Sequence, residues 1–142
     1  MNASVVSLPV NQHLLKDLSD QPPANLRDER LYVNPELSLL RFNDRVLAQA
    51  GNPELPLLER LRFVCISRLL LDEFFEVRVA ALRQRILHDA ATPGPDGMSP
   101  RETLIRIRDE CVSLVDRQYR IFRHELKPAL EAENIRFLDT RE

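Results

Sequence analysis

The sequence predicts an all-α protein, an antiparallel bundle of long helices. Apolar residues recur at three- or four-residue spacing between positions 39 and 122. Proline and N-capping residues stand where the periodic stretches begin, and turn-forming residues separate them. The 142 residues suit one domain, which can bury a core without disulfides or metals.

The first helix is predicted to begin at Asn34, Pro35 and Glu36. Asn is a good N-cap, and Pro at the first helical position loses no needed N–H. Glu36 then lies in the first turn, where the helix dipole favours an acidic residue. The Gly-Asn-Pro sequence at 51–53 ends the helix. Its expected apolar face comprises Leu39, Phe42, Val46 and Ala50, with Leu40 and Leu47 beside them.

The second helical pattern starts at Leu55-Pro56 and continues to Leu87. It runs for more than 30 residues without Gly or Pro, well beyond the usual helix length. This length leaves room for a break near Ser67–Leu71, and Ser67 is the best candidate because its side chain can cap a new start.

The third helix follows a loop at residues 91–99. Ser99 and Glu102 have the spacing of a capping box, and the apolar period then continues to Phe122. Pro128 is expected to kink or end this helix near Lys127.

The pattern divides the chain into three parts. Residues 1–30 are expected to form a flexible tail, residues 31–133 the helical domain, and residues 134–142 an extended connection to a following domain. The expected core includes Phe42, Leu61, Phe74, Val77, Leu114 and Phe122.

Composition narrows the class of protein. The net charge of −2 gives no electrostatic basis for nucleic-acid binding. The N-terminus lacks a secretory pattern and no apolar run could form a transmembrane segment, so the cytoplasm is the expected location. Cys65 and Cys111 lie in apolar helical stretches and are expected to be reduced core residues.

The residues offer no constellation for catalysis or metal binding. His13, His88 and His124 have no partners at ligand or triad spacing. Asp72 and Glu73 are adjacent on a helix and point about 100° apart, so they cannot face one substrate together. From the residues alone, the chain is a soluble helical module without its own active site.

Four ordered blocks nevertheless resemble the N-terminal domain of polyphosphate kinases. A looser likeness continues through residues 117–119 and 134–138. The four blocks are LYVNPELS at 31–38, FNDRVL at 42–47, PLLERLRF at 56–63 and LDEFFEVRVA at 71–80.

The resemblance implies an activity for the full-length enzyme. Such an enzyme transfers the terminal phosphate of ATP reversibly to inorganic polyphosphate, with magnesium and through a phosphohistidine intermediate. The catalytic histidines lie in C-terminal domains that this chain does not contain. Family members are oligomeric, and their N-terminal domain packs against other domains and helps to frame the nucleotide site.

Leu70 departs from the family pattern. The family places an Asn directly before Leu-Asp-Glu-Phe, and its amide helps to hold the adenine. Leu70 can only pack, because it has no hydrogen-bonding group. The alternatives are that Leu70 packs against the ring, that Arg68 stacks on it, that the adenine pocket is shifted, that the sequence is altered here, or that Leu70 points into the bundle.

The alternative to a kinase domain is a stand-alone helical module for protein interaction, without catalysis. A natural module should stop after a capped helix. The chain instead reaches an extended stretch, Ile-Arg-Phe-Leu at 135–138, which favours a domain of a longer enzyme.

Overall fold

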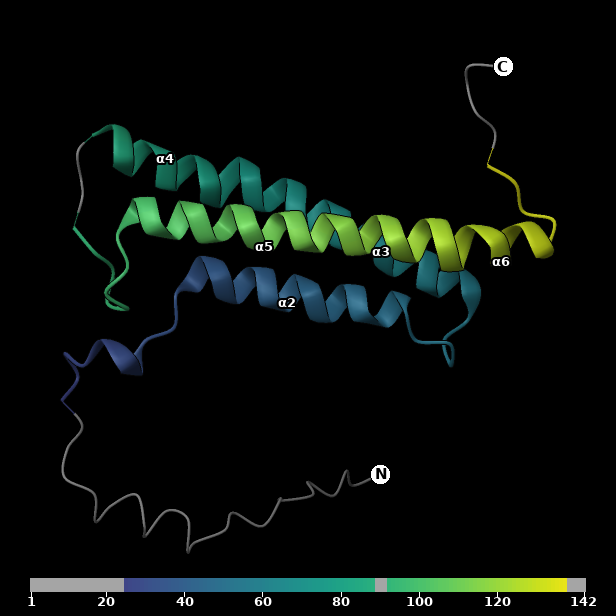
Figure 1. The fold of residues 1–142 in the computed structure, drawn as a ribbon, viewed down its shortest axis with the longest axis horizontal. Coiled ribbons are helices and arrows are strands. Elements are labelled where there is room, and N and C mark those ends of the chain that lie inside the picture. Colours follow the sequence, from purple (N-terminus) through teal and green to yellow (C-terminus); the bar gives the residue numbers. More distant parts are fainter. Residues whose placement is uncertain (1–24, 89–91, 138–142) are drawn as a thin grey trace, which may run out of the picture.

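The computed structural model describes residues 25–88 and 92–137, and every regular element in these ranges is helical (Figure 1). The prediction of an all-α bundle is therefore confirmed. No helix in these ranges is long and apolar enough to cross a membrane. The elements are η1 (Glu29–Leu31), α2 (Pro35–Ala50), α3 (Leu57–Glu73), η2 (Phe74–Val79), α4 (Ala80–Leu87), α5 (Pro100–Ile121), η3 (Phe122–Leu126) and α6 (Lys127–Ala132).

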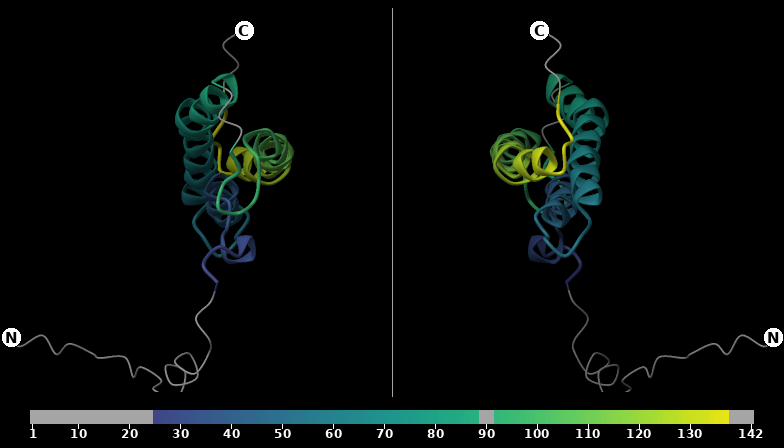
Figure 2. Two further views of the ribbon diagram at one scale, coloured as in Figure 1. Left: turned by 90° about the vertical axis from the view of Figure 1, so that its left-hand side faces the viewer. Right: turned by 90° about the vertical axis from the view of Figure 1, so that its right-hand side faces the viewer.

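The elements join into three long helical rods. The π-helical turn η2 connects α3 to α4 without a break, and the π-helical turn η3 connects α5 to α6 in the same way. End-on views show α2 against α3 and α5 (Figure 2). The helices α3 and α5 pack on α2 far more extensively than on each other. The two longer rods also pack on each other, through α4 against α5 and α3 against η3, so the domain is a three-rod bundle in which each rod contacts the other two.

The helix starts follow the predicted local chemistry. The Asn34 side chain accepts hydrogen bonds from the backbone N–H groups of Glu36 and Leu37. Ser99 and Glu102 form the capping box in both directions. Caps depend on neighbouring residues only, so the sequence was sufficient to place them.

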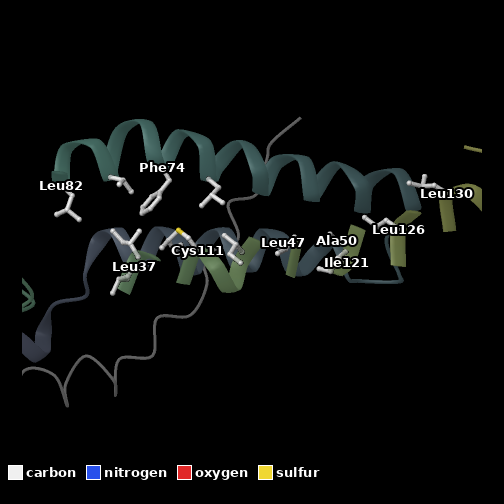
Figure 3. Packing of buried hydrophobic residues seen from close by; sticks show 14 residues of the cluster. Leu37, Leu47, Ala50, Phe74, Leu82, Cys111, Ile121, Leu126 and Leu130 are labelled. Carbon is white, nitrogen blue, oxygen red and sulfur yellow. The ribbon is translucent and has the colours of Figure 1, made fainter. Parts of the chain in front are cut away.

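The core runs along the seam between the rods (Figure 3). Of the expected core residues, Phe74 and Leu114 are buried and Leu61 packs against the core. The prediction is wrong for Phe42, which is 46% exposed, and Val77, which is 56% exposed. The buried residues are Leu37, Leu40, Leu47, Ala50, Leu71, Phe74, Val79, Leu82, Ile107, Cys111, Leu114, Ile121, Leu126 and Leu130.

Three other expectations need correction. No break occurs at Ser67: its side chain is fully buried and accepts a hydrogen bond from Gln118, so it does not cap a new helix. Pro128 does not end the third rod, because the wider turn of η3 precedes it and accommodates the missing N–H. Cys65 is exposed, whereas Cys111 is buried as expected.

Both ends of the described chain are irregular. Residues 25–28 form a turn before η1, and the first 24 residues of the predicted tail lie outside the described ranges. After α6, Asn134 adopts a left-handed conformation with φ of 62°. The chain then brings Phe137 edge-on to Phe122, with ring centroids 5.3 Å apart. The expected extended run is present over residues 135–137 without strand pairing, and Leu138 lies outside the described residues.

Candidate functional site

The candidate site is a surface groove between α2 and the rod formed by α3 and η2, here called the α2–α3 groove. Its volume of about 300 Å³ is at the lower end of the range for small-molecule sites. Its walls comprise Leu39, Leu40, Phe42 and Asn43 from α2, Leu70 and Glu73 from α3, and Phe74, Val77 and Arg78 from η2.

The groove combines apolar walls with two charged side chains. Phe42 and Val77, which the sequence assigned to the core, are exposed on its opposite walls. Glu73 and Arg78 supply one negative and one positive charge. An apolar slot with a few polar groups is the usual composition of a site for a flat organic ligand.

The structure separates the two residues that the sequence singled out. Leu70 is half-buried and lines the α2–α3 groove, so it does not point into the bundle core. Arg68 lies on the other side of α3, in a second groove shared with α5, and pairs with Asp72. Residues two apart on a helix point about 200° apart. Leu70 and Arg68 therefore cannot contact the same small ring.

The sequence predicted that the adjacent residues Asp72 and Glu73 cannot face one substrate together, and the structure agrees. Asp72 forms an ion pair with Arg68 on the α5 side, whereas Glu73 lines the α2–α3 groove. The structure does not bring the two carboxylates together. Only Glu73 can face a ligand in the groove.

A buried polar bridge supports the groove from behind. Asn43 donates from Nδ2 to the backbone carbonyl of Ser67 at 2.9 Å, and Gln118 donates from Nε2 to Ser67 Oγ at 2.8 Å. These bonds join α2, α3 and α5, and an ion pair between Asp44 and Arg117 also connects α2 to α5. Sequence analysis missed the bridge, although polar residues at helical core spacing were a usable signal.

The described histidines lie away from the groove. His88 caps the end of α4 and His124 is in η3, and both are exposed. His13 is outside the described residues. Within the described ranges, no three His, Cys, Asp or Glu side chains are grouped as metal ligands would be.

The fold and the groove define a small helical domain with an open groove between two of its long helices. Residues 32–138 match the family model described as the polyphosphate kinase N-terminal domain. The chain belongs to this family.

Relatives agree with the family match. Over 105 residues, 74% of this chain, it is 49% identical to polyphosphate kinase of Burkholderia multivorans. Over 117 residues, 82% of this chain, it is 47% identical to polyphosphate kinase of Pseudomonas syringae pv. tomato. The matched regions span only 15% and 16% of those relatives. No solved structure matches the chain.

Proposed function

We propose that this chain serves as the N-terminal domain of a cytoplasmic enzyme that transfers the terminal phosphate of ATP reversibly to inorganic polyphosphate. In that enzyme the α2–α3 groove holds the adenine of the nucleotide. The observation that carries the proposal is the position of Leu70. The residue that aligns with the family's adenine-contacting Asn lies in the wall of the groove, not in the core.

The groove suits a purine held by packing. The ring of Phe42 and the side chains of Leu70 and Val77 offer apolar surface on both walls. Leu70 removes one hydrogen bond to the base edge, which is worth about 0.5–1.5 kcal/mol. Burial of ring area offsets part of this loss, at about 25 cal/mol per Å² of apolar surface.

Positive charge beside the groove suits the phosphates. Arg78 lines the η2 wall. Arg45 does not line the groove, but its guanidinium carbon lies 5.7 Å from the centroid of the Phe42 ring, which does. Arginine pairs well with phosphate oxygens because its planar fork offers several N–H donors. One arginine in the groove wall and one beside Phe42 would attract a triphosphate that leaves the groove.

The remaining chemistry belongs to parts of the enzyme outside this chain. Magnesium, the histidine that carries the phosphoryl group and the polyphosphate path are assigned to the other domains. The role of this domain is to position the nucleotide and to contact those domains. The isolated chain should therefore show no ATP-dependent polyphosphate synthesis.

The test is to fill the groove in the full-length enzyme. Leu70→Trp should raise KM for ATP about tenfold, equivalent to about 1.4 kcal/mol of binding, with little change in KM for polyphosphate. Leu69→Trp is the matched control, because Leu69 is the preceding residue and is 67% exposed away from the groove. Val77→Trp fills the groove from its other wall and should reproduce the effect of Leu70→Trp.

The comparison separates binding from folding. Circular-dichroism melts of the three variants should agree within a few degrees, because none of the three side chains belongs to the core. If both groove-filling variants kept the KM for ATP of the control, the adenine would be held elsewhere.

A further inference from the structure

The α2–α3 groove offers few hydrogen-bonding groups to a ligand. Among its lining residues, only Asn43, Glu73 and Arg78 have polar side chains. The backbone around it belongs to helices, whose N–H and C=O groups are bonded to one another. Recognition of a base in this groove therefore depends on the donors and acceptors of these three side chains.

One of the three side chains is left to contact the edge of a base. Asn43 donates from Nδ2 to the Ser67 carbonyl at 2.9 Å, and its Oδ1 is buried, so it offers the groove no donor. Arg78 only donates, and the proposed nucleotide site assigns it to the phosphates. Glu73 remains, and its carboxylate only accepts hydrogen bonds.

Glu73 is placed to contact the edge of a ring that packs on Leu70. It follows Leu70 by three residues on α3, and side chains at this spacing are neighbours on one helix face. It is exposed and takes part in no ion pair within residues 25–88 and 92–137. A carboxylate repels a triphosphate, so Glu73 weakens nucleotide binding unless the base donates hydrogen bonds to it.

The two purines differ in what they offer a carboxylate. Guanine has two adjacent donors, N1–H and the N2 amino group, so both carboxylate oxygens accept a charge-assisted hydrogen bond. Adenine has one donor, the N6 amino group, beside the acceptor N1. One carboxylate oxygen then faces a lone pair. An amide suits adenine because it both donates and accepts, but Leu70 has no such group.

We propose that Glu73 determines which purine this groove binds, and that the groove holds guanine at least as tightly as adenine. The full-length enzyme then uses GTP as well as ATP as its phosphate donor. GTP loses its terminal phosphoryl group and leaves as GDP, and polyphosphate gains one phosphate unit. This inference rests on the proposed nucleotide site at Leu70, to which it adds the residue that selects the base and a second substrate.

The first test is Glu73→Gln in the full-length enzyme, with KM measured for GTP and for ATP. In the original enzyme, KM for GTP should be no higher than KM for ATP. The Gln amide loses the charge-assisted bonds to guanine and gains an acceptor for N6 and a donor for N1 of adenine. The ratio of KM for GTP to KM for ATP should therefore rise about tenfold, equivalent to about 1.4 kcal/mol.

A matched control removes the same charge beside the groove. Glu76 is exposed on η2 and does not line the groove, so Glu76→Gln should leave the ratio unchanged. Both substitutions keep the size of an exposed side chain, so neither should affect folding.

Inosine triphosphate tests the contact with the N2 amino group, because its base is guanine without that group. With the original enzyme, KM for inosine triphosphate should exceed KM for GTP several-fold. Glu73→Gln should abolish this difference, because the Gln amide can bind N1–H and O6, which both bases share.

The outcomes separate this inference from the proposed site. If Leu70→Trp raises KM for both nucleotides but Glu73→Gln leaves the ratio unchanged, the groove holds the base and Glu73 does not select it. An equal rise in both KM values in Glu73→Gln would place Glu73 at the ribose, which both nucleotides share, and would also overturn the inference. So would an original enzyme with a KM for GTP more than about tenfold above that for ATP, or about 1.4 kcal/mol. If Leu70→Trp changes neither KM, the nucleotide site itself is wrong, and the inference falls with it.

Discussion

The buried polar bridge makes a quantitative prediction. Ser67→Ala removes the hydroxyl that accepts a hydrogen bond from Gln118 Nε2 at 2.8 Å. The Gln118 side chain is 6% exposed, so water cannot replace the lost partner. Leaving a buried donor unpaired costs about 1–3 kcal/mol. For a chain of this size the melting temperature should fall by roughly 3 °C per kcal/mol.

A double-mutant cycle isolates the bond itself. Gln118→Leu removes the donor, and Ser67→Ala combined with Gln118→Leu replaces both polar groups by apolar ones. Removing both partners together is often nearly neutral. The double variant should therefore be more stable than the sum of the two single changes predicts, by about 1 kcal/mol or more.

Urea unfolding of the chain, followed by far-ultraviolet circular dichroism, gives the four free energies of unfolding. The slope of the free energy of unfolding against urea concentration should be the same for all four proteins, since the surface exposed on unfolding hardly changes. Additivity within about 0.5 kcal/mol would refute the bridge. So would a Ser67→Ala variant as stable as the original.

Burial leads to four further predictions. Phe74→Ala should cost about 3–5 kcal/mol, whereas Phe42→Ala should cost far less, which thermal melts can compare. Leu70→Asn should leave the melting temperature nearly unchanged and tighten ATP binding to the full-length enzyme several-fold at most, since one hydrogen bond gives about 0.5–1.5 kcal/mol; a lower melting temperature with unchanged affinity would contradict the groove. Burial raises the pKa of Cys111 to about 11, so at pH 8 a thiol reagent should modify Cys65 rapidly and Cys111 only on unfolding. The same pKa shift predicts that stability falls as pH rises from about 9 towards 11, because the unfolded thiol ionises first.

Much of the helical layout was predictable because it is encoded locally. The caps at Asn34 and Ser99 depend on hydrogen bonds within one turn, and the end of α2 at Gly51 depends on its own turn. The separation of Leu70 from Arg68 was also implicit, since residues two apart point to opposite sides of a helix.

The apolar face of α2 was harder to predict. Hydropathy predicted that Phe42 would be buried and Asn43 exposed, but the structure buries Asn43 and exposes Phe42. Asn43 is accepted in the core because the Ser67 carbonyl receives its hydrogen bond. That partner comes from another helix, and no local pattern in α2 reveals it.

The two π-helical turns also altered the expected register. In η2, a four-residue step from Phe74 would bury Arg78, but the extra residue of the wider turn buries Val79 instead. In η3, a four-residue step from the buried Ile121 would bury Glu125, but the extra residue of the wider turn buries Leu126 instead. A regular 3.6-residue period would place a charge in the core at both sites. The cost of burying a charge exceeds the cost of one irregular turn.

Changing the number of residues in η2 tests this account. Deleting Glu76 should convert the turn to a regular α-helix, with Phe74 and Val79 now at normal four-residue spacing. Leu82 keeps its place in the core, so the variant should stay folded with a melting temperature close to that of the original chain. Inserting one Ala after Glu76 instead rotates Val79 and Leu82 about 100° away from the core. Each of these buried side chains contributes about 1.5–3 kcal/mol, so the insertion should lower the melting temperature strongly. Equal melts for the deletion and the insertion would show that the register of α4 does not depend on η2.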